Sequence, residues 1–588
     1  MAIATKNKIS EDECYSVIEE SKFKIKERYT YLIIILISVS LFLPGIFLRD
    51  FWVFDEGRRA LIALEMFRKN EWLIPRLLGK LILTKPPLFY WMEVIAFHIT
   101  GSTSDWSARL PSVIAGIAGV IALFNILKQL LDRKSALIGV LAMSVSPIYF
   151  WMAQYAEPEM LFVATGLISM MFFCKIISQE KPSFFNKFCL YFFLSLSLMT
   201  KSPIMPLIII FTIAIWIIIM KRGDLIKHLS LFSGTILFLA PILLWFLLLM
   251  LTGLSPSNLI REMMSHLDVD EALHSKSFLY YLTHLDTLMF PWSFLIIFAF
   301  LYYIFKFFKE GWKNFKSQFL KTGEYFLQGN GERFFLLIFF IVSILINSIV
   351  PSKRYYYGLI LAPSASAIVA LIYYELSSTI SEKLENFISR YKFQILSATI
   401  CISIILLMAG LLVKEKEALK DFSGNNSLNT KILLILVGVW FSGLSLILVL
   451  KRKIIKSSSF LEGIFYWAFC CMFFLASIFN FIIHPVINEQ LSLKKSALEI
   501  KNRIPAEANL YSIRSTHTIW FYLGRTDIPE ISDSQELQKY VKANPESYGV
   551  VYRKYQKIVD NAGKYKILYT SEYLPVERLQ VLLFKMTE

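Results

Sequence analysis

Long apolar runs separated by short polar tracts dominate the chain between residues 30 and 483. A helix needs about 20 apolar residues to cross the hydrocarbon core of a bilayer. The pattern predicts thirteen spans, at 30–48, 110–131, 135–153, 160–177, 188–202, 203–220, 229–251, 286–306, 334–350, 355–374, 393–413, 431–450 and 460–483. Only Lys201-Ser202-Pro203 separates the fifth run from the sixth, so we expect two short helices that meet near one membrane surface.

The pattern changes after residue 483, where short alternating stretches replace the apolar runs. Strand-like segments occur at Leu510–Ile513, Tyr548–Tyr552, Tyr565–Tyr569 and Leu579–Phe584, with polar helical or loop stretches between them. We therefore expect a small soluble α/β domain at 484–588, joined to an α-helical transmembrane domain at 30–483 and a polar tail at 1–29. No long internal repeat is visible, which weakens a transporter interpretation because many transporters are built from repeated halves.

Composition supports the membrane class. Hydrophobic residues make up 56% of the chain and charged residues 18%, whereas an ordinary soluble protein is about 45–50% apolar and about 25% charged. Disordered, collagen-like and disulfide-scaffold classes are excluded, and the six cysteines show neither a disulfide framework nor metal-ligand spacing. The net charge of +16 lies mostly in tracts between apolar runs, so we expect membrane topology and no nucleic-acid partner to explain it.

Positive charge also predicts the orientation of the chain. Lys and Arg gather in the tail and in alternate connections, for example at 22–28, 133–134, 221–222 and 451–456, whereas the turn at 154–159 has none. The positive-inside rule then places the N-terminus in the cytoplasm and the C-terminal domain in the periplasm. The loop at 49–109 falls on the outer side, with two short helical stretches near 58–69 and 86–100 that we expect to be interfacial.

Acidic and basic residues gather in these outer segments. Asp55-Glu56 and Arg58-Arg59 follow the first span, Lys85-Pro86-Pro87 comes later in the same loop, and Glu157-Pro158-Glu159 forms an outer turn. Each feature also has a structural interpretation: the two acids can cap a helix N-terminus, and Lys85 can anchor the chain at the lipid headgroups. Found together at a lipid boundary, acids and cations suit a lipid-phosphate substrate.

In this order the motifs resemble those of the polytopic GT-C glycosyltransferases, and above all the 4-amino-4-deoxy-L-arabinose lipid A transferases, which are relatives of the protein O-mannosyltransferases. The resemblance covers nearly the whole chain. It rests on Asp55-Glu56-Gly57-Arg58-Arg59, Trp72-Leu73-Ile74-Pro75, Lys85-Pro86-Pro87, Ala108-Arg109-Leu110-Pro111, Glu157-Pro158-Glu159, Thr200-Lys201-Ser202-Pro203, Arg261-Glu262, Pro351-Ser352-Lys353-Arg354-Tyr355 and Phe521-Tyr522-Leu523-Gly524-Arg525.

The resemblance implies an undecaprenyl-phosphate-linked sugar donor, a lipid A acceptor and a location in the bacterial inner membrane. Asp55 matches the leading acidic position of the family, and Glu159 matches a second position where Asp is more common. Charge develops on the leaving phosphate, and preorganised cations stabilise such charge. The candidates for this role are Lys85, Arg58, Lys201, Lys353 and Arg354, and those for a substrate groove are Glu56, Arg261 and Tyr355.

The role of Asp55 depends on the acceptor. A Ser or Thr hydroxyl must lose a proton, so a carboxylate would act as general base. A lipid A phosphate is already ionised, and Asp55 would then orient the substrate, balance charge at the anomeric carbon or bind the amino group of the sugar. Direct attack would invert the anomeric centre in either case.

No metal or other cofactor is expected. Family members often carry an acid directly before Lys-Pro-Pro, but Thr84 occupies that position here, and Glu262, His266 and His274 have no ligand spacing. A divalent metal would therefore lack a ligand. We expect a monomer surrounded by membrane lipids.

Three functions stay open at this stage. The first is transfer of an aminosugar to lipid A, which would lower the surface charge that attracts cationic antimicrobial peptides. The second is a protein O-mannosyltransferase-like or other cell-envelope glycan transferase that uses the same donor type. The third, a transporter of a lipid-linked precursor, is disfavoured because the polar candidates cluster at the outer ends of the spans. Aminoarabinose, galactosamine and mannose donors would all make similar phosphate contacts.

Overall fold

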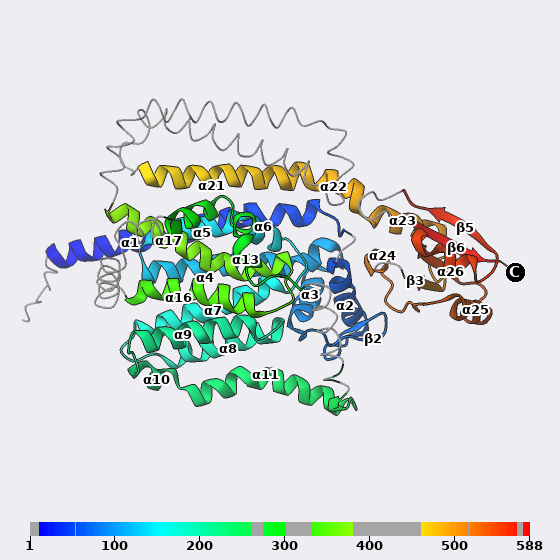
Figure 1. Ribbon diagram of the computed structural model, residues 1–588, viewed down its shortest axis with the longest axis horizontal. Helices are drawn as coiled ribbons and strands as arrows, with labels where there is room; N and C mark the ends of the chain where they lie inside the picture. Colours follow the sequence, from blue (N-terminus) through cyan, green and yellow to red (C-terminus); the bar gives the residue numbers. More distant parts are fainter. Residues whose placement is uncertain are drawn as a thin grey trace, which may run out of the picture.

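The computed structural model describes residues 11–52, 55–257, 259, 261, 275–301, 331–379, 460–514, 517–572 and 580–587. Within these ranges, six helices are long and apolar enough to cross a membrane: Glu27–Leu48, Asp105–Leu130, Glu159–Ile177, Leu231–Leu251, Tyr355–Ser377 and Glu462–Glu489. Most of the helices lie side by side in one bundle, with the strands of the C-terminal segment at one end of it (Figure 1). The chain is a multi-pass membrane protein.

The bundle follows the predicted order of apolar runs. Its helices are α1 (Glu11–Leu48), α4 (Asp105–Leu130), α5 (Arg133–Val145), α6 (Pro147–Met152), α7 (Glu159–Ile177), α8 (Phe184–Thr200), α9 (Ile204–Ile219), α10 (Asp224–Leu229), α11 (Leu231–Leu251), α13 (Tyr280–Thr283), α14 (Leu285–Leu288), α16 (Gly331–Ile349), η1 (Tyr355–Ile360), α17 (Leu361–Thr379), α21 (Phe460–Ile478) and η2 (Phe479–Ile483). The predicted spans 393–413 and 431–450, and the end of 286–306, lie outside the described residues.

Prolines set two of the breaks. The long stretch 188–220 is two helices, as expected, because Pro203 disfavours helical geometry at the preceding residue. The predicted span 135–153 differs from the structure. Ser146, which precedes Pro147, adopts an extended conformation and divides the stretch into α5 and α6. The short α6 then leads into the 153–158 turn, which carries Glu157.

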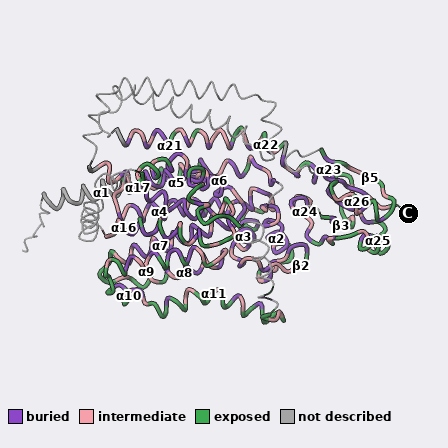
Figure 2. The backbone as a smooth tube through the Cα atoms, viewed as in Figure 1, coloured by how far each residue is buried: buried purple, intermediate pink, exposed green. Residues whose placement is uncertain are grey.

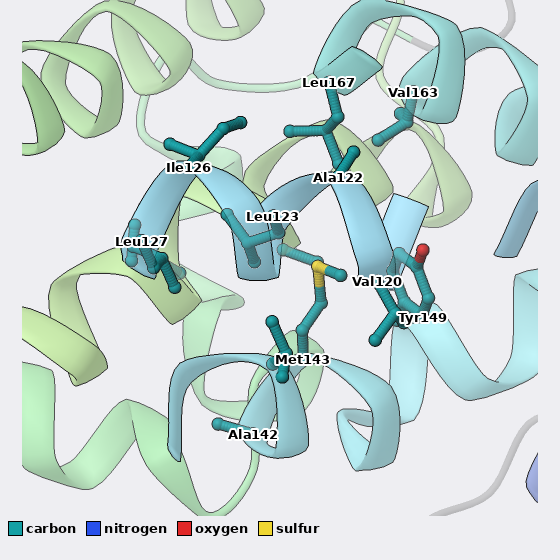
Figure 3. Close-up of a cluster of buried hydrophobic side chains, with 14 of the residues drawn as sticks. Val120, Ala122, Leu123, Ile126, Leu127, Ala142, Met143, Tyr149, Val163 and Leu167 are labelled. Atoms are coloured by element: carbon teal, nitrogen blue, oxygen red, sulfur yellow. The ribbon is translucent and has the colours of Figure 1, made fainter. Parts of the chain in front are cut away.

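A dense apolar core holds this turn in place. Figure 3 shows Met143 of α5 extending toward Leu123 of α4, with Tyr149 of α6 beside Val120. The hydroxyl of Tyr149 donates to the carbonyl of Gly116 at 2.7 Å. A Cβ built on Gly119 would lie 2.4 Å from the hydroxyl oxygen of Tyr149. Close-packed interiors tolerate little change in volume. The spacing between α4 and α6 is therefore fixed where α6 leads into the 153–158 turn.

The two helices of the 49–109 segment are α2 (Asp55–Lys69) and α3 (Leu88–Thr100), joined through a hairpin of β1 (Arg76–Leu77) and β2 (Lys80–Leu81). The structure differs here from the predicted interfacial placement, because α2 is buried along most of its length (Figure 2). Its charged residues Arg59 and Glu65 are buried too, each with partners: Glu157 and Tyr90 for Arg59, and Lys69 and Gly79 for Glu65.

The C-terminal segment contains α22 (His484–Leu491), α23 (Lys494–Arg503), β3 (Leu510–Ile513), α24 (His517–Leu523), α25 (Ser534–Ala543), β4 (Tyr548–Tyr552), η3 (Arg553–Tyr555), α26 (Gln556–Asp560), β5 (Tyr565–Thr570) and β6 (Val581–Met586). The strands form one sheet in the order β3-β4-β6-β5, with β3 and β4 parallel and the other pairs antiparallel. A parallel pair needs a crossover connection, and α24 and α25 lie in that connection. Helix α24 packs directly on α2, which brings this segment to the start of α2.

Candidate active site

A cavity of about 740 Å³ lies where α2 meets the bundle. Its walls come from the first turn of α2, from α6 and the turn after it, and from the connection between α16 and η1. The lining residues are Asp55, Pro147, Trp151, Met152, Tyr155, Glu157, Lys353, Arg354, Tyr355 and Tyr356. Mostly apolar and aromatic walls with a few convergent charges are typical of small-molecule sites of about 300–1,000 Å³.

Asp55 is the first residue of α2 and is partly exposed to this cavity. Arg354 Nη1 donates to its Oδ2 at 3.2 Å, and Arg58 Nε lies 3.9 Å from its Oδ1. Burial raises the pKa of Asp55, but the positive charges of Arg58, Arg59 and Arg354 outweigh burial and hold the pKa below its usual range. Asp55 is therefore a stable carboxylate at neutral pH and a weak proton acceptor.

Glu157 is the second acid of the cavity. Arg59 Nε lies 3.3 Å from its Oε2, and Arg59 Nη1 also donates to Tyr90 at 3.0 Å. Burial raises the pKa of Glu157 to about 7, since Arg59 offsets only part of the cost and the neighbouring Glu159 adds to it. Glu157 is thus a carboxyl group that can exchange a proton near neutral pH.

Lys85 follows the β1–β2 hairpin and completes the charged cluster behind Glu157. Burial, followed by the positive charge of Arg59, lowers its pKa to about 7, although Glu159 and Glu157 act in the opposite direction. Its ammonium group makes no hydrogen bond or ion pair with the part of the chain that the structure describes. An anion placed beside Lys85 would restore the charged form.

Glu159 and Lys201 form an ion pair next to Lys85. Lys201 Nζ donates to Glu159 Oε1 at 2.7 Å and lies 3.8 Å from the ring centroid of Tyr357. Within the described residues, Glu159 Oε2 is buried without a hydrogen-bond partner, as are the hydroxyls of Thr84 and Ser202 beside Lys85 and Lys201. A buried polar group without a partner costs about 1–3 kcal/mol, so a ligand rich in hydroxyls would gain by bonding to these groups.

The structure places Glu56 apart from the predicted groove. Its side chain is buried and receives hydrogen bonds from Arg49 at 2.7 and 2.8 Å and from Arg109 at 2.8 and 3.0 Å. The backbone N–H of Ala156 also donates to it at 2.9 Å. Glu56 therefore joins Arg49 just after α1, Arg109 of α4 and the 153–158 turn to the start of α2, which fixes Asp55 and Glu157 relative to each other.

Replacing Glu56 with Gln is expected to lower the free energy of unfolding by about 3–5 kcal/mol, because two buried guanidinium groups lose their counter-charge. Denaturant titration in detergent micelles, followed by tryptophan fluorescence, measures this change. The matched control is Glu499→Gln, which removes an exposed partner of Arg503 and should change stability by less than about 0.5 kcal/mol. Equal stability of the two variants would contradict the role given to Glu56.

The other predicted residues occupy different positions. Lys353 lines the cavity, but its ammonium donates to the carbonyls of Val350 at 2.6 Å and Lys276 at 3.4 Å. Tyr355 also lines the cavity and donates to the carbonyl of Thr287 at 3.3 Å. Arg261 is exposed and is not part of the cavity wall.

Two residues of the site are not among the sequence candidates, although both belong to motifs that carry the resemblance. Arg59 and Glu157 each stand within two residues of a chosen candidate, in Asp55–Arg59 and in Glu157-Pro158-Glu159. Spacing alone gave no reason to prefer one acid or one arginine in these pairs. Among the described residues, no three His, Cys, Asp or Glu side chains gather as a metal site, and Glu262, His266 and His274 lie outside those residues.

Comparison with known proteins identifies similar sequences. Residues 84–246 match the profile of the dolichyl-phosphate-mannose-protein mannosyltransferase family. The undecaprenyl phosphate-alpha-4-amino-4-deoxy-L-arabinose arabinosyl transferase of Edwardsiella ictaluri is 26% identical over 53% of this chain and 55% of its own length. The enzyme of the same name from Pectobacterium atrosepticum is 26% identical over 60% of both chains. The chain thus spans little more than half the length of these curated relatives.

Solved structures show the same fold. The crystal structure of ArnT from Cupriavidus metallidurans bound to undecaprenyl phosphate has a TM-score of 0.70 at 15% identity and covers 94% of this chain and 97% of that one. The apo structure of the same protein gives a TM-score of 0.67 at 16% identity over 96% and 98%. These matches confirm the resemblance to polytopic GT-C glycosyltransferases that the motifs predicted.

Proposed function

We propose that the protein is an inverting glycosyltransferase of the bacterial inner membrane that moves an aminosugar from undecaprenyl phosphate to a lipid A phosphate. The N-terminus would lie in the cytoplasm, and the cavity and the C-terminal segment would face the periplasm. The chain would act as a monomer. Support comes from the charged cavity, from the relatives named for aminoarabinose transfer and from the fold shared with a structure that holds undecaprenyl phosphate.

The donor phosphate would bind beside Lys85. As the bond to the sugar breaks, negative charge builds on the phosphate oxygens, and a cation already in place stabilises that charge without reorganisation. Lys85 is half-buried and has a lowered pKa, so it gains an anionic partner on binding. Arg58, Lys201 and Arg354 would add positive charge around the donor. Each is already paired with a carboxylate: Arg58 and Arg354 with Asp55, and Lys201 with Glu159. Lys353 contributes less, since its ammonium is bound to carbonyls.

The observation that favours a lipid A phosphate is the ionisation of Asp55. A carboxylate with a lowered pKa is a poor general base, but it suits an acceptor that arrives already ionised. Asp55 would then balance the positive charge that develops at the anomeric carbon, at the cavity end of α2. Glu159, held by Lys201, would bond to the donor sugar through its unpartnered oxygen.

Transfer to a Ser or Thr hydroxyl is the second candidate, favoured by Glu157. A hydroxyl acceptor needs a base, and a carboxyl group with a pKa of about 7 in the same cavity could serve as one. The family profile over residues 84–246 is named for protein mannosylation. In this alternative the donor would bind in the same way, and the acceptor alone would differ.

Mass spectrometry of lipid A separates the two candidates. The protein is expressed in a host that makes an undecaprenyl-phosphate aminosugar but lacks its own transferase, and the control carries Asp55→Asn. We expect the mass increment of one aminosugar on a lipid A phosphate with the natural chain only. Unmodified lipid A together with newly glycosylated envelope proteins would reject lipid A as acceptor and support the second candidate.

A further inference from the structure

Residues 48–52 lead from the end of α1 toward α2 and form no regular structure after Leu48. Several of their backbone groups nevertheless bond to side chains from other elements. Arg109 of α4 donates to the carbonyls of Arg49 and Asp50, the latter at 2.9 Å. We call residues 48–52 the entry segment. Further partners of the entry segment come from the C-terminal segment.

Asn488 of α22 makes three hydrogen bonds with the entry segment. Its Nδ2 donates to the carbonyl of Leu48 at 2.8 Å. Its Oδ1 accepts from the backbone N–H of Asp50 at 3.0 Å and from Trp52 Nε1 at 2.9 Å. One amide side chain therefore holds both ends of the entry segment against α22.

Tyr522 of α24 holds the middle of the entry segment. Its hydroxyl accepts from the backbone N–H of Phe51 at 2.6 Å and donates to Asp105 at 3.1 Å. The ring of Phe51 also packs on Phe521, with centroids 5.0 Å apart. Because Asp105 begins α4, the tyrosine links the C-terminal segment, the entry segment and the bundle through one oxygen.

Asp50 is bound by the start of α23. Ser492 Oγ donates to it at 2.8 Å, and Lys494 Nζ donates to it at 2.9 Å and to Asp105 at 3.2 Å. The two contacts to Asp50 join residues more than 400 positions apart in sequence. They place the C-terminal segment directly against the chain that leads to Asp55.

Close packing adds to these bonds at the first turn of α2. A Cβ built on Gly57 would lie 2.3 Å from the Thr518 hydroxyl and 2.7 Å from the Thr518 Cα. The second of these atoms is backbone, so α24 would have to move to make room. Only glycine at position 57 allows α24 to lie this close to Asp55.

From these contacts we infer that α22 and α24 position Asp55, with Asn488 and Tyr522 as positioning residues that act through the entry segment. The inference rests on the proposed function for its kinetic consequence. A displacement of about 1 Å in a catalytic group can lower a rate about 100-fold, and a site held on rigid supports avoids that loss. The C-terminal segment would therefore be part of the catalytic machinery although it contacts no reacting atom.

Tyr522→Phe tests the inference with the smallest change, because it removes one oxygen and keeps the ring. We expect kcat to fall about 10–100-fold while KM for the donor stays within about threefold, since the donor contacts are untouched. Backbone amides of residues 49–57 should exchange hydrogen for deuterium at least tenfold faster than in the natural chain. Tyr540→Phe on α25, whose ring packs on Tyr511, is the control. It should change neither kcat nor the exchange rates of residues 49–57.

Two further variants guard against a simple loss of folding. Gly57→Ala should mimic Tyr522→Phe, whereas Gly463→Ala in α21, where an added Cβ meets nothing within 4 Å, should have no effect. In an Asp55→Asn background, Tyr522→Phe should lower the single-turnover rate by less than about threefold, because it acts through a carboxylate that is no longer present. A full additional loss would overturn the inference.

The exchange measurement stands apart from the proposed function. Unchanged exchange at 49–57 in Tyr522→Phe and Gly57→Ala would overturn the positioning role, whatever the enzyme transfers. Faster exchange with unchanged kcat would overturn its link to catalysis. A natural chain that transfers no sugar would reject the proposed function, while faster exchange in the two variants would still support the contacts that hold the entry segment.

Discussion

Asp55→Asn is expected to lower the rate of sugar transfer by about 1,000-fold, because it removes the negative charge that the proposed function places opposite the anomeric carbon and keeps the shape of the side chain. The substitution leaves Arg58 and Arg354 beside a neutral amide. Their freed positive charge would oppose the developing oxocarbenium charge, which adds to the loss. Single-turnover transfer by purified protein in detergent or nanodiscs, with product detected by mass, measures the effect.

The control for this variant is Asp224→Asn, which neutralises the exposed aspartate that begins α10 and pairs with Arg222. It should transfer sugar at the natural rate, and both variants should insert in the membrane in equal amounts. Binding of undecaprenyl phosphate to Asp55→Asn should stay within about threefold of the natural chain or strengthen, since the loss lies in the transition state. Transfer by Asp55→Asn within threefold of the natural rate would contradict the role of Asp55.

Lys85→Met is expected to lower kcat/KM for the donor by about 100–1,000-fold, because it removes the preorganised cation that the proposed function places beside the leaving phosphate. Methionine keeps the length and apolar character of the stem, so packing between α3 and the hairpin should be retained. Lys80→Met on β2, which removes an exposed lysine paired with Glu530, is the control. Equal kcat/KM for the two variants would contradict the assignment of Lys85 to the donor phosphate.

The pH dependence of donor use follows from the same residue. The pKa of Lys85 in the donor-free protein is about 7, so its ammonium loses its proton as the pH rises above 7. A bound phosphate favours the protonated form, and the donor keeps its charge over this range. We therefore expect kcat/KM for the donor to fall up to about tenfold for each pH unit above 7.

Glu157 acts in the same direction. Its pKa of about 7 means that it gains negative charge as the pH rises, which further disfavours an anionic donor. In Lys85→Met the decline of kcat/KM above pH 7 should become shallower, with Glu157 as the remaining titrating group. A rate profile that is flat from pH 6 to 9 in the natural chain would contradict both assignments.

The sequence predicted much of the fold because hydrophobic pattern and proline positions act locally. The break between α8 and α9 lies at Lys201-Ser202-Pro203, and β3 and β4 have the predicted bounds. The burial of α2 was not predictable in the same way. A helix with charges on one face is typical of an interface, and only the partners of Arg59 and Glu65, which come from distant parts of the chain, make burial possible.

In the site, too, local motifs predict some features, and contacts between distant residues determine the others. The motifs identified which acids and cations would be near each other, since Asp55, Lys85, Glu159, Lys201 and Arg354 all take part in the charged cluster or line the cavity. Pairing could not be read from spacing, because it depends on side-chain direction. Neighbouring acids therefore differ in position: Asp55 lines the cavity, while Glu56, expected in the substrate groove, is buried between Arg49 and Arg109.

The sequence also does not predict that the C-terminal segment contacts the residues before Asp55. The Phe521–Arg525 motif is part of the resemblance, but nothing in it indicates that Tyr522 bonds to the backbone N–H of Phe51. A contact between residues this far apart depends on the whole fold. Local sequence patterns therefore do not predict this contact.

Binding of undecaprenyl phosphate to the purified protein tests the central claim most directly. Titration at pH 6.5 should show saturable binding by the natural chain and by Asp55→Asn, with a Kd for the variant that is at most about threefold higher. Lys85→Met should bind at least about tenfold more weakly, which corresponds to about 1.4 kcal/mol. Equal binding by all three proteins would contradict the claim that Lys85 and the charged cluster around it hold the donor phosphate, and so would the absence of saturable binding by the natural chain.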